Sequence, residues 1–302
     1  MADMRFDNRV AIITGGGGSL GRSHALMLAR RGCNIVLNDV GGSFKGEGSD
    51  KGPAQKVVDE IKALGVKCVA NFDDIGSKEG GKNVVKAAID NFGRVDIVIN
   101  NAGIIRDVSF HKMSEEDWDK IYSVHVKGVF NVTHAAWPHM RDANYGRIVM
   151  TTSGAGLWGN FGQVNYSSAK MAQVGMMNTL KIEGKKHNIK VNTIAPIAKS
   201  RMTETVMPPP MLAKFQPEAI SAMVTYLCSE ECEESGAIYE GGGGYYTRVW
   251  ICQHPGTYIP VEQVTAEKFR DEVRGKIADA TQSKAVPGLQ EATMGIMKHI
   301  KF

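Results

Sequence analysis

A tyrosine and a lysine in the middle of the chain have the spacing of an acid–base pair. Tyr166 and Lys170 are four residues apart, so a helix would carry both side chains on one face and set an ammonium beside a phenol. An unperturbed tyrosine titrates near ~10, which is too high for a base near neutrality, and a nearby positive charge stabilises the phenolate. The pair therefore predicts a tyrosine general acid/base whose pKa is lowered by Lys170.

A glycine-rich stretch near the N-terminus has the composition of a phosphate-binding loop. Residues 13–21 are ITGGGGSLG and lie between a predicted strand and a predicted helix. The N–H groups at such a junction form an anion site, and glycines allow a pyrophosphate to approach the backbone. Asp39, at the end of the next predicted strand, can accept hydrogen bonds from an adenosine ribose and repel a 2′-phosphate. Together they predict NAD as cofactor; the alternative is that both features are only turn chemistry.

Short apolar runs predict the elements that position these residues. The predicted strands are 10–14, 34–39, 66–72, 95–100, 147–152 and 190–195, each continuously apolar, as is typical of strands buried on both faces. Helical stretches alternate with them, which predicts an α/β fold, a doubly wound parallel sheet of the Rossmann type. Ligands of such sheets bind beyond the carboxyl ends of the strands, where the glycine loop and Asp39 fall.

The pattern weakens after about residue 200. We expect a Rossmann-type domain over 1–250 with a substrate lid around 200–217, where prolines interrupt a segment rich in methionine. Residues 251–302 are expected to form a helical extension that packs on the domain or on a partner subunit. The segment 41–53 is too polar and glycine-rich to pack, so we expect a mobile surface loop there.

Composition argues against several other kinds of protein. A chain of 302 residues with 43% hydrophobic residues can bury a core without disulfides or metals. The net charge of +4 has no long run of like charges, so no nucleic-acid partner is expected. Five cysteines without a CxxC pair predict free thiols in an intracellular compartment. No metal site, secretory signal or membrane span is expected either, which leaves a small molecule as the partner.

The glycine loop resembles that of the short-chain dehydrogenase/reductase family. It matches the TGxxxGxG fingerprint at Thr14, Gly15 and Gly21, with Ser19 in place of the middle glycine. Serine is a favoured N-cap, so we expect the Ser19 hydroxyl to donate to a phosphate oxygen or to hold N–H groups of the first helical turn. The resemblance implies that NAD is bound by Gly15, Gly17, Ser19, Leu20, Gly21, Asp39, Asp74, Ile75, Asn101, Ala102, Gly103, Tyr166, Lys170, Ile197 and Thr203. For Asp74, a surface turn is the competing interpretation.

The catalytic motif strengthens this resemblance. Ser153 follows the fifth predicted strand and precedes Tyr166 by thirteen residues, as in the family. The resemblance implies that Tyr166 exchanges a proton with the substrate oxygen, that Lys170 also binds the nicotinamide ribose, and that Ser153 binds the carbonyl or alcohol. His125 stands where the family has an asparagine that holds a relay water. It is either a fourth catalytic residue or a packed helix histidine.

Longer stretches, among them NDVGGSFKGEG and GNFGQVNYSSAK, resemble one branch of the family. That branch oxidises (3R)-3-hydroxyacyl-CoA to 3-oxoacyl-CoA with NAD in peroxisomal fatty-acid β-oxidation. The resemblance implies an acyl-CoA substrate, a homodimer and a peroxisomal location, although the final residues HIKF are not the peroxisomal tripeptide. The alternatives are a steroid 17β-hydroxyl dehydrogenase, a 3-oxoacyl reductase or a nucleotide sensor without turnover, in the cytoplasm or mitochondrion.

Overall fold

The computed structural model describes residues 4–200, 203–205 and 207–299. The chain divides into two units, Met1–Arg248 and Val249–Phe302. Part of the segment in which we expect a lid, 200–217, lies outside the described residues.

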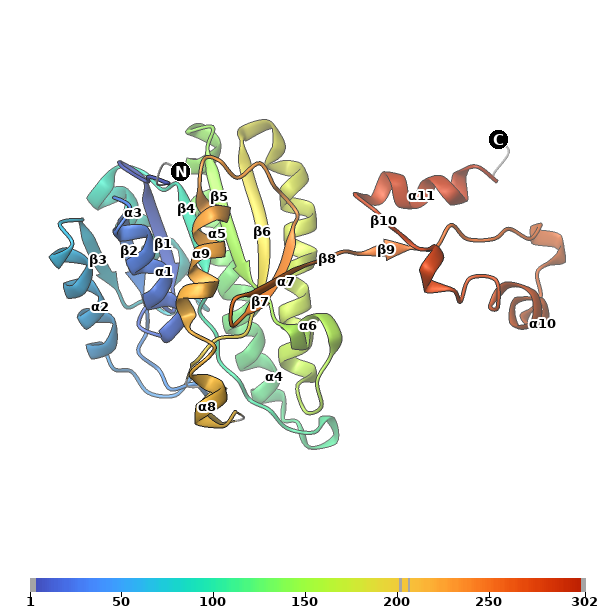
Figure 1. The fold of residues 1–302 in the computed structure, drawn as a ribbon, viewed down its shortest axis with the longest axis horizontal. Coiled ribbons are helices and arrows are strands. Elements are labelled where there is room, and N and C mark those ends of the chain that lie inside the picture. Colours follow the sequence, from blue (N-terminus) through green and yellow to red (C-terminus); the bar gives the residue numbers. More distant parts are fainter. Residues whose placement is uncertain (1–3, 201–202, 206, 300–302) are drawn as a thin grey trace. The chain divides into compact units, whose positions relative to one another are not determined.

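The first unit is built on an eight-stranded sheet with the order β3-β2-β1-β4-β5-β6-β7-β8 (Figure 1). The strands are β1 (Val10–Thr14), β2 (Asn34–Asn38), β3 (Cys68–Asn71), β4 (Ile97–Asn100), β5 (Gly146–Thr151), β6 (Ile189–Pro196), β7 (Ile238–Gly242) and β8 (Tyr245–Val249). Strands β1 to β7 pair in parallel. The strand order reverses between β1 and β4, where ligands of doubly wound sheets bind. The predicted Rossmann fold is confirmed.

The last two strands were not predicted from the sequence. The segment YEGGGGYY shows little apolar character, yet it contains most of β7, the turn and the start of β8. Gly243 and Gly244 connect the strands with φ angles of +59° and +87°, which glycine adopts without strain. A turn of two residues can join only antiparallel neighbours, so β8 closes the edge of the sheet as a hairpin.

Helices cover both faces of the sheet (Figure 1). One face is covered by α1 (Ser19–Ala29), α2 (Gly52–Ala63) and α9 (Pro217–Cys228), and the other by α3 (Lys78–Phe92), α5 (Val129–Asp142) and α7 (Val164–Glu183). The shorter helices α4 (Glu115–Tyr122), α6 (Gly154–Trp158) and α8 (Pro209–Leu212) lie toward the carboxyl ends of the strands. Local signals set the bounds of α3: Ser77 accepts the Gly80 N–H as N-cap, and Gly93 ends the helix at φ +74°.

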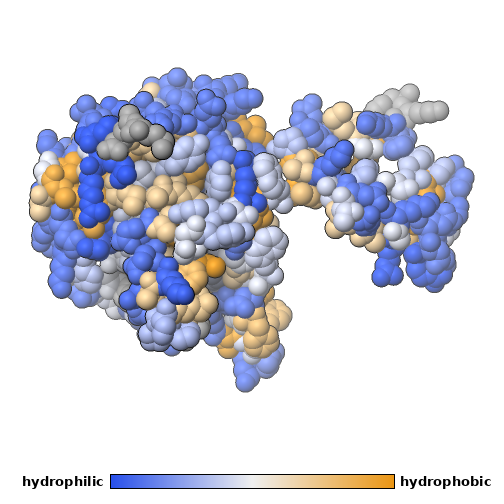
Figure 2. Space-filling view, viewed as in Figure 1, coloured by the Kyte–Doolittle hydropathy of each residue, from blue (hydrophilic) through white to orange (hydrophobic). Residues whose placement is uncertain are grey.

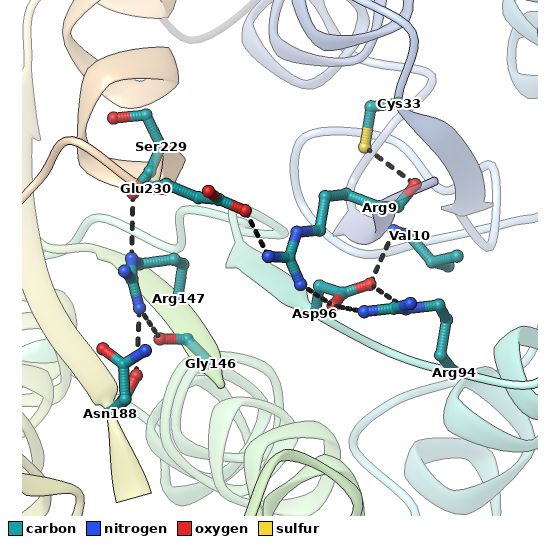
Figure 3. Close-up of polar contacts among 10 residues, drawn as sticks. All are labelled: Arg9, Val10, Cys33, Arg94, Asp96, Gly146, Arg147, Asn188, Ser229 and Glu230. Atoms are coloured by element: carbon teal, nitrogen blue, oxygen red, sulfur yellow. Dashed lines mark hydrogen bonds and ion pairs between the residues drawn. The ribbon is translucent and has the colours of Figure 1, made fainter. Parts of the chain in front are cut away.

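Ion pairs connect the amino ends of the strands, at the opposite edge of the sheet (Figure 3). The carboxylate of Asp96, 1% exposed, accepts hydrogen bonds from Arg9 (2.8 Å) and Arg94 (2.7 Å). Arg147 donates to the backbone carbonyl of Ser229 at 2.9 Å and so joins β5 to the segment after α9. These guanidinium groups all have protein partners, so this cluster stabilises the sheet edge.

The second unit has little internal packing. It contains α10 (Ala266–Lys268), α11 (Leu289–Met297) and a ladder of β9 (Cys252–Gln253) with β10 (Lys284–Ala285). None of its described residues is fully buried.

Figure 2 shows polar residues over much of the visible surface of the protein, with apolar patches between them. Within the part of the chain that the structure describes, no helix has the length and apolar character needed to cross a bilayer.

Candidate active site

A cavity of about 650 Å³ lies at the carboxyl ends of the parallel strands. It is lined by most of the residues that the sequence predicts for the site: Gly15, Ser19, Leu20, Gly21, Asp39, Asp74, Ile75, Asn101, Ala102, Gly103, His125, Ser153, Tyr166, Lys170 and Thr203. Two predicted residues, Gly17 and Ile197, are not among the lining residues. The N–H of Ile197 donates to the Gly241 carbonyl at 2.8 Å, which extends the pairing of β6 with β7.

The glycine loop needs bare backbone because it packs closely on the loop after β4. Gly15 has φ +66°, and a Cβ there would lie 2.8 Å from the Cα of Ala102. A Cβ at Gly21 would lie 2.2 Å from the Gly15 carbonyl oxygen. The Asn101 side-chain amide donates to the carbonyls of Thr14 (3.0 Å) and Gly15 (3.2 Å), which fixes both loops together. The start of α1 lines the cavity, which is where an anion site at a helix N-terminus would lie.

Asp39 is oriented by backbone N–H groups on both sides. Its Oδ2 accepts from Gly17 at 2.8 Å and its Oδ1 accepts from Gly41 at 2.7 Å. Each carboxylate oxygen keeps a lone pair that can accept a ribose hydroxyl, and the negative charge disfavours a 2′-phosphate. Gly17 thus acts on the cavity through Asp39. These residues fit an NAD site.

Ser19 differs from the expectation about capping. Gly18 is the N-cap of α1, and the Ser19 hydroxyl forms no cap hydrogen bond. It donates instead to the Lys199 carbonyl at 2.7 Å, which connects the glycine loop with the segment after β6. The Thr203 hydroxyl also donates to a backbone carbonyl of this segment, that of Ala198, at 2.9 Å. The capping prediction was wrong because α1 begins at Ser19, one residue earlier than a Ser19 N-cap would require.

Ser153, Tyr166 and Lys170 converge on the cavity from two elements. Helix α7 places the Lys170 Nζ 5.5 Å from the centroid of the Tyr166 ring, as the four-residue spacing predicts. The same ammonium donates to the Thr151 carbonyl at 2.5 Å. Ser153 is the N-cap of α6 and accepts the Ala155 N–H at 3.2 Å, so its own O–H remains available to donate.

The protonation of this group differs from the sequence prediction. Desolvation by the surrounding protein raises the pKa of Tyr166 to about 12, and the Ser153 hydroxyl opposes this rise. Burial also lowers the pKa of Lys170 to about 7. The expectation that Lys170 lowers the pKa of Tyr166 is wrong for this structure, because burial disfavours both charged forms. Tyr166 is therefore a protonated phenol at neutral pH.

His125 lies in a π-helical segment, Ser123–Gly128, between α4 and α5. Its Nε2 is 2.8 Å from the carbonyl oxygen and 3.1 Å from the amide nitrogen of Ile104. The ring meets Tyr166 edge-on, with centroids 5.2 Å apart. Burial and the Lys170 charge lower the pKa of His125, so the ring is neutral. The His125 Nδ1 is buried and has no hydrogen-bond partner within the described ranges. The histidine is therefore packed in the protein, and its Nδ1 remains available for a hydrogen bond.

The segment 41–53 packs, contrary to expectation. The Ile105 N–H donates to the Phe44 carbonyl at 2.9 Å, and the Arg106 Nε donates to the Lys45 carbonyl at 3.1 Å. Phe44 lines the cavity together with several glycines of the same loop. Backbone carbonyls, which composition does not reveal, bind this loop to the segment after β4 and turn it into a cavity wall.

Several polar lining residues were missed from the sequence, among them Asp107, Gln163 and Asn160. Asp107 lies in the loop after β4, beyond the NNAG motif. Because ligands bind at the carboxyl ends of the strands, considering the whole of this loop and not only its first residues could have found Asp107. Gln163 and Asn160 had no such signal, because they lie in the turn before α7. Among the residues that the structure describes, no group of three or more His, Cys, Asp or Glu side chains is placed to hold a metal ion.

Comparison with known proteins agrees with this geometry. Residues 9–209 match the family model described as short chain dehydrogenase. The chain belongs to the short-chain dehydrogenase family. This short-chain dehydrogenase is 48% identical over 297 residues to peroxisomal multifunctional enzyme type 2 of Mus musculus, covering 98% of this chain and 40% of that protein. It is 51% identical over 268 residues to peroxisomal multifunctional enzyme A of Dictyostelium discoideum, covering 89% of this chain and 60% of that protein.

Solved structures extend the comparison. Full-length peroxisomal multifunctional enzyme type 2 from Drosophila melanogaster matches with a TM-score of 0.82 and 36% identity, over 98% of this short-chain dehydrogenase and 50% of that chain. Carveol dehydrogenase from Mycobacterium avium in complex with NAD matches with a TM-score of 0.71 and 25% identity, over 79% and 97% of the two chains. The chain thus spans about half the length of the multifunctional relatives. The predicted family and its oxidoreductase class are confirmed.

Proposed function

We propose that this short-chain dehydrogenase oxidises (3R)-3-hydroxyacyl-CoA to 3-oxoacyl-CoA with NAD, as a step of fatty-acid β-oxidation. The observation that carries the proposal is the convergence of Ser153, Tyr166 and Lys170 on one cavity that also contains Asp39. The similarity to peroxisomal multifunctional enzymes supports the substrate class.

The cofactor would be held by the residues that line one end of the cavity. The backbone of the glycine loop would bind the pyrophosphate, Asp39 the adenosine ribose, and Lys170 the nicotinamide ribose. NAD, when bound, accepts the hydride that leaves the substrate carbinol carbon. The Asp74 carboxylate accepts the Gly76 N–H at 2.8 Å and so fixes the turn after β3, against which an adenine would pack.

The protein supplies the proton chemistry. Tyr166 is protonated at neutral pH, so it must lose its proton before it can take one from a substrate hydroxyl. The Ser153 hydroxyl lowers the pKa of Tyr166 and is therefore the group that stabilises the phenolate. If Nε2 of His125 donates to Ile104, Nδ1 is left as an acceptor in the same proton path. Because the phenolate fraction grows as pH rises toward the Tyr166 pKa of about 12, we expect oxidation to accelerate with pH.

Location and assembly follow the relatives in this proposal. We expect a peroxisomal enzyme that forms a homodimer, in which residues 251–302 pack on the Rossmann domain or on the partner subunit. Cell fractionation tests the location. Light scattering tests the assembly, and it is repeated with residues 1–250 alone to show whether the extension contributes.

The test of the activity is the absorbance of the reduced nicotinamide. Purified protein is mixed with NAD and either (3R)- or (3S)-3-hydroxyacyl-CoA, and Tyr166→Phe is compared with Tyr245→Phe, which removes the hydroxyl of a side chain 71% exposed. We expect turnover of the (3R) isomer alone, lost in the first variant and kept in the second. If neither isomer is oxidised although NAD binds, the proposed substrate is wrong. The protein would then act on another hydroxyl substrate, such as a steroid, or be a nucleotide sensor.

A further inference from the structure

A carboxylate without a role in the proposed acid–base chemistry lies on the cavity wall near Tyr166. The Oδ2 of Asp107 accepts a hydrogen bond of 2.6 Å from the Gln163 Nε2. Gln163 is the N-cap residue of α7, three residues before Tyr166, and all three residues line the same cavity. The Asp107 charge is close enough to the phenol to contribute to the raised pKa of Tyr166.

The position of this carboxylate is fixed. The Gln163 Oε1 accepts from the Asn160 Nδ2 at 3.0 Å, so the amide of Gln163 presents its nitrogen to Asp107. The backbone is held as well, because the Val108 N–H donates to the Gly162 carbonyl at 2.9 Å. Surrounding protein raises the pKa of Asp107, whereas the Gln163 N–H stabilises its ionised form. Asp107 itself is exposed, so a substrate that enters the cavity meets its charge.

Among the described residues, Asp107 has no cationic partner. The neighbouring Arg106 is engaged elsewhere: its guanidinium pairs with Asp117 at 3.0 Å, Glu116 at 3.3 Å and Glu47 at 3.7 Å. Two ammonium groups also line the cavity. The Lys170 ammonium donates to the Thr151 carbonyl. The Cε of Lys120 lies 3.3 Å from the position that a Cβ would take at Gly46, in the loop after β2.

We propose that Asp107 is a specificity-determining residue that admits neutral thioesters and excludes the free 3-hydroxy acids. A substrate whose C3 hydroxyl reaches Tyr166 has C1 only two bonds from the reacting carbon, so the group at C1 enters the same part of the cavity. A thioester is neutral there, whereas a free acid carries a carboxylate that the Asp107 charge repels as substrate displaces water. This inference rests on the proposed function and names the feature that restricts it to acyl thioesters.

The test compares two small substrates that both lack CoA: (3R)-3-hydroxybutyrate and its methyl ester. Their kcat/KM values are measured with the native protein, with Asp107→Asn, and with Asp119→Asn, which removes the same charge from an exposed position of α4 outside the cavity. We expect the native protein to prefer the ester. We expect Asp107→Asn to raise kcat/KM for the acid relative to the ester by about tenfold, and Asp119→Asn to leave that ratio unchanged.

Three results would overturn the inference. The native protein could oxidise acid and ester equally well, which needs no variant and so holds even if Asp107→Asn fails to fold. The ratio could be unchanged in Asp107→Asn, or it could change equally in Asp119→Asn. If the small substrates react too slowly, they are compared as competitive inhibitors of (3R)-3-hydroxybutyryl-CoA oxidation, where the ester should inhibit at lower concentration than the acid. Failure of the native protein to oxidise that thioester would instead refute the proposed function.

Discussion

Gly21 is the position at which one added methyl group should distort the cofactor loop. A Cβ there would lie 2.2 Å from the Gly15 carbonyl oxygen, 2.8 Å from the Gly16 Cα and 2.9 Å from the Asn101 Nδ2. Two of these three atoms belong to the backbone and cannot rotate away. The Gly21→Ala variant must therefore move α1 or the loop, and overpacking of this kind costs about 1–3 kcal/mol.

Gly18 is the matched control in the same loop. A Cβ there would lie 3.4 Å from the nearest atom, the Gly15 carbonyl oxygen, and the residue has φ −80°, which alanine adopts freely. Gly18→Ala restricts the unfolded chain, which favours folding by about 0.4–1 kcal/mol, but alanine is a poorer N-cap than glycine. We therefore expect a free energy of unfolding close to that of the native protein. Of the two variants, only Gly21→Ala is expected to lower the free energy of unfolding by more than about 1 kcal/mol.

The assay is urea unfolding of the cofactor-free protein, followed by titration with NAD. For Gly21→Ala we expect a loss of about 1–3 kcal/mol in the free energy of unfolding. We also expect a Kd for NAD at least about tenfold higher than in the native protein, because the anion site moves with the loop. The reasoning is refuted if Gly21→Ala unfolds at the same urea concentration as Gly18→Ala.

Three further predictions concern charge and protonation. Asp39→Asn removes the negative charge that faces the ribose, so the ratio of the Kd values for NADP and NAD should fall at least about tenfold, as measured by titration of both cofactors. Arg106→Gln removes the ion pairs to Glu47 and α4, so the KM for NAD should rise several-fold with little change in kcat, and limited proteolysis should cut faster within residues 41–50. His24 is buried, and burial lowers its pKa from 6.5 to about 3, so the folded protein keeps it neutral while the unfolded chain takes up a proton below pH 6.5. The contribution of His24 to stability is thus complete above pH 6.5 and is lost as pH falls toward 3: between pH 7 and pH 5 the native protein should lose about 2 kcal/mol more than His24→Asn in urea unfolding.

Each of these predictions has a result that contradicts it. Unchanged discrimination against NADP would mean that the Asp39 charge does not face the ribose. Unchanged proteolysis in Arg106→Gln would mean that backbone contacts alone hold the loop; Arg270→Gln, in the second unit, controls for loss of a surface charge. An equal pH dependence in native protein and His24→Asn would mean that the histidine is accessible to protons in the folded state.

Much of the fold and of the site could be predicted because the signals are local. Strands β1 to β6 are continuous apolar runs, so each could be located within a few residues of its bounds. The four-residue spacing of Tyr166 and Lys170 requires only that α7 be a helix, and the glycine loop requires only a strand followed by a helix. The hairpin of β7 and β8 lacks such a signal, because its residues are glycine-rich and alternate little.

The motifs and their spacing were thus enough to predict which residues form the site and that these residues lie at the carboxyl ends of the strands. The protonation of these residues and the groups that surround them depend on the folded chain. The pKa of Tyr166 rises because the surrounding protein desolvates its hydroxyl. Asp107, in the loop after β4, is held at the cavity by a hydrogen bond from Gln163 at the start of α7, which is distant in the sequence. Desolvation and contacts between distant segments depend on the whole packed chain, so neither is written in the spacing of neighbouring residues.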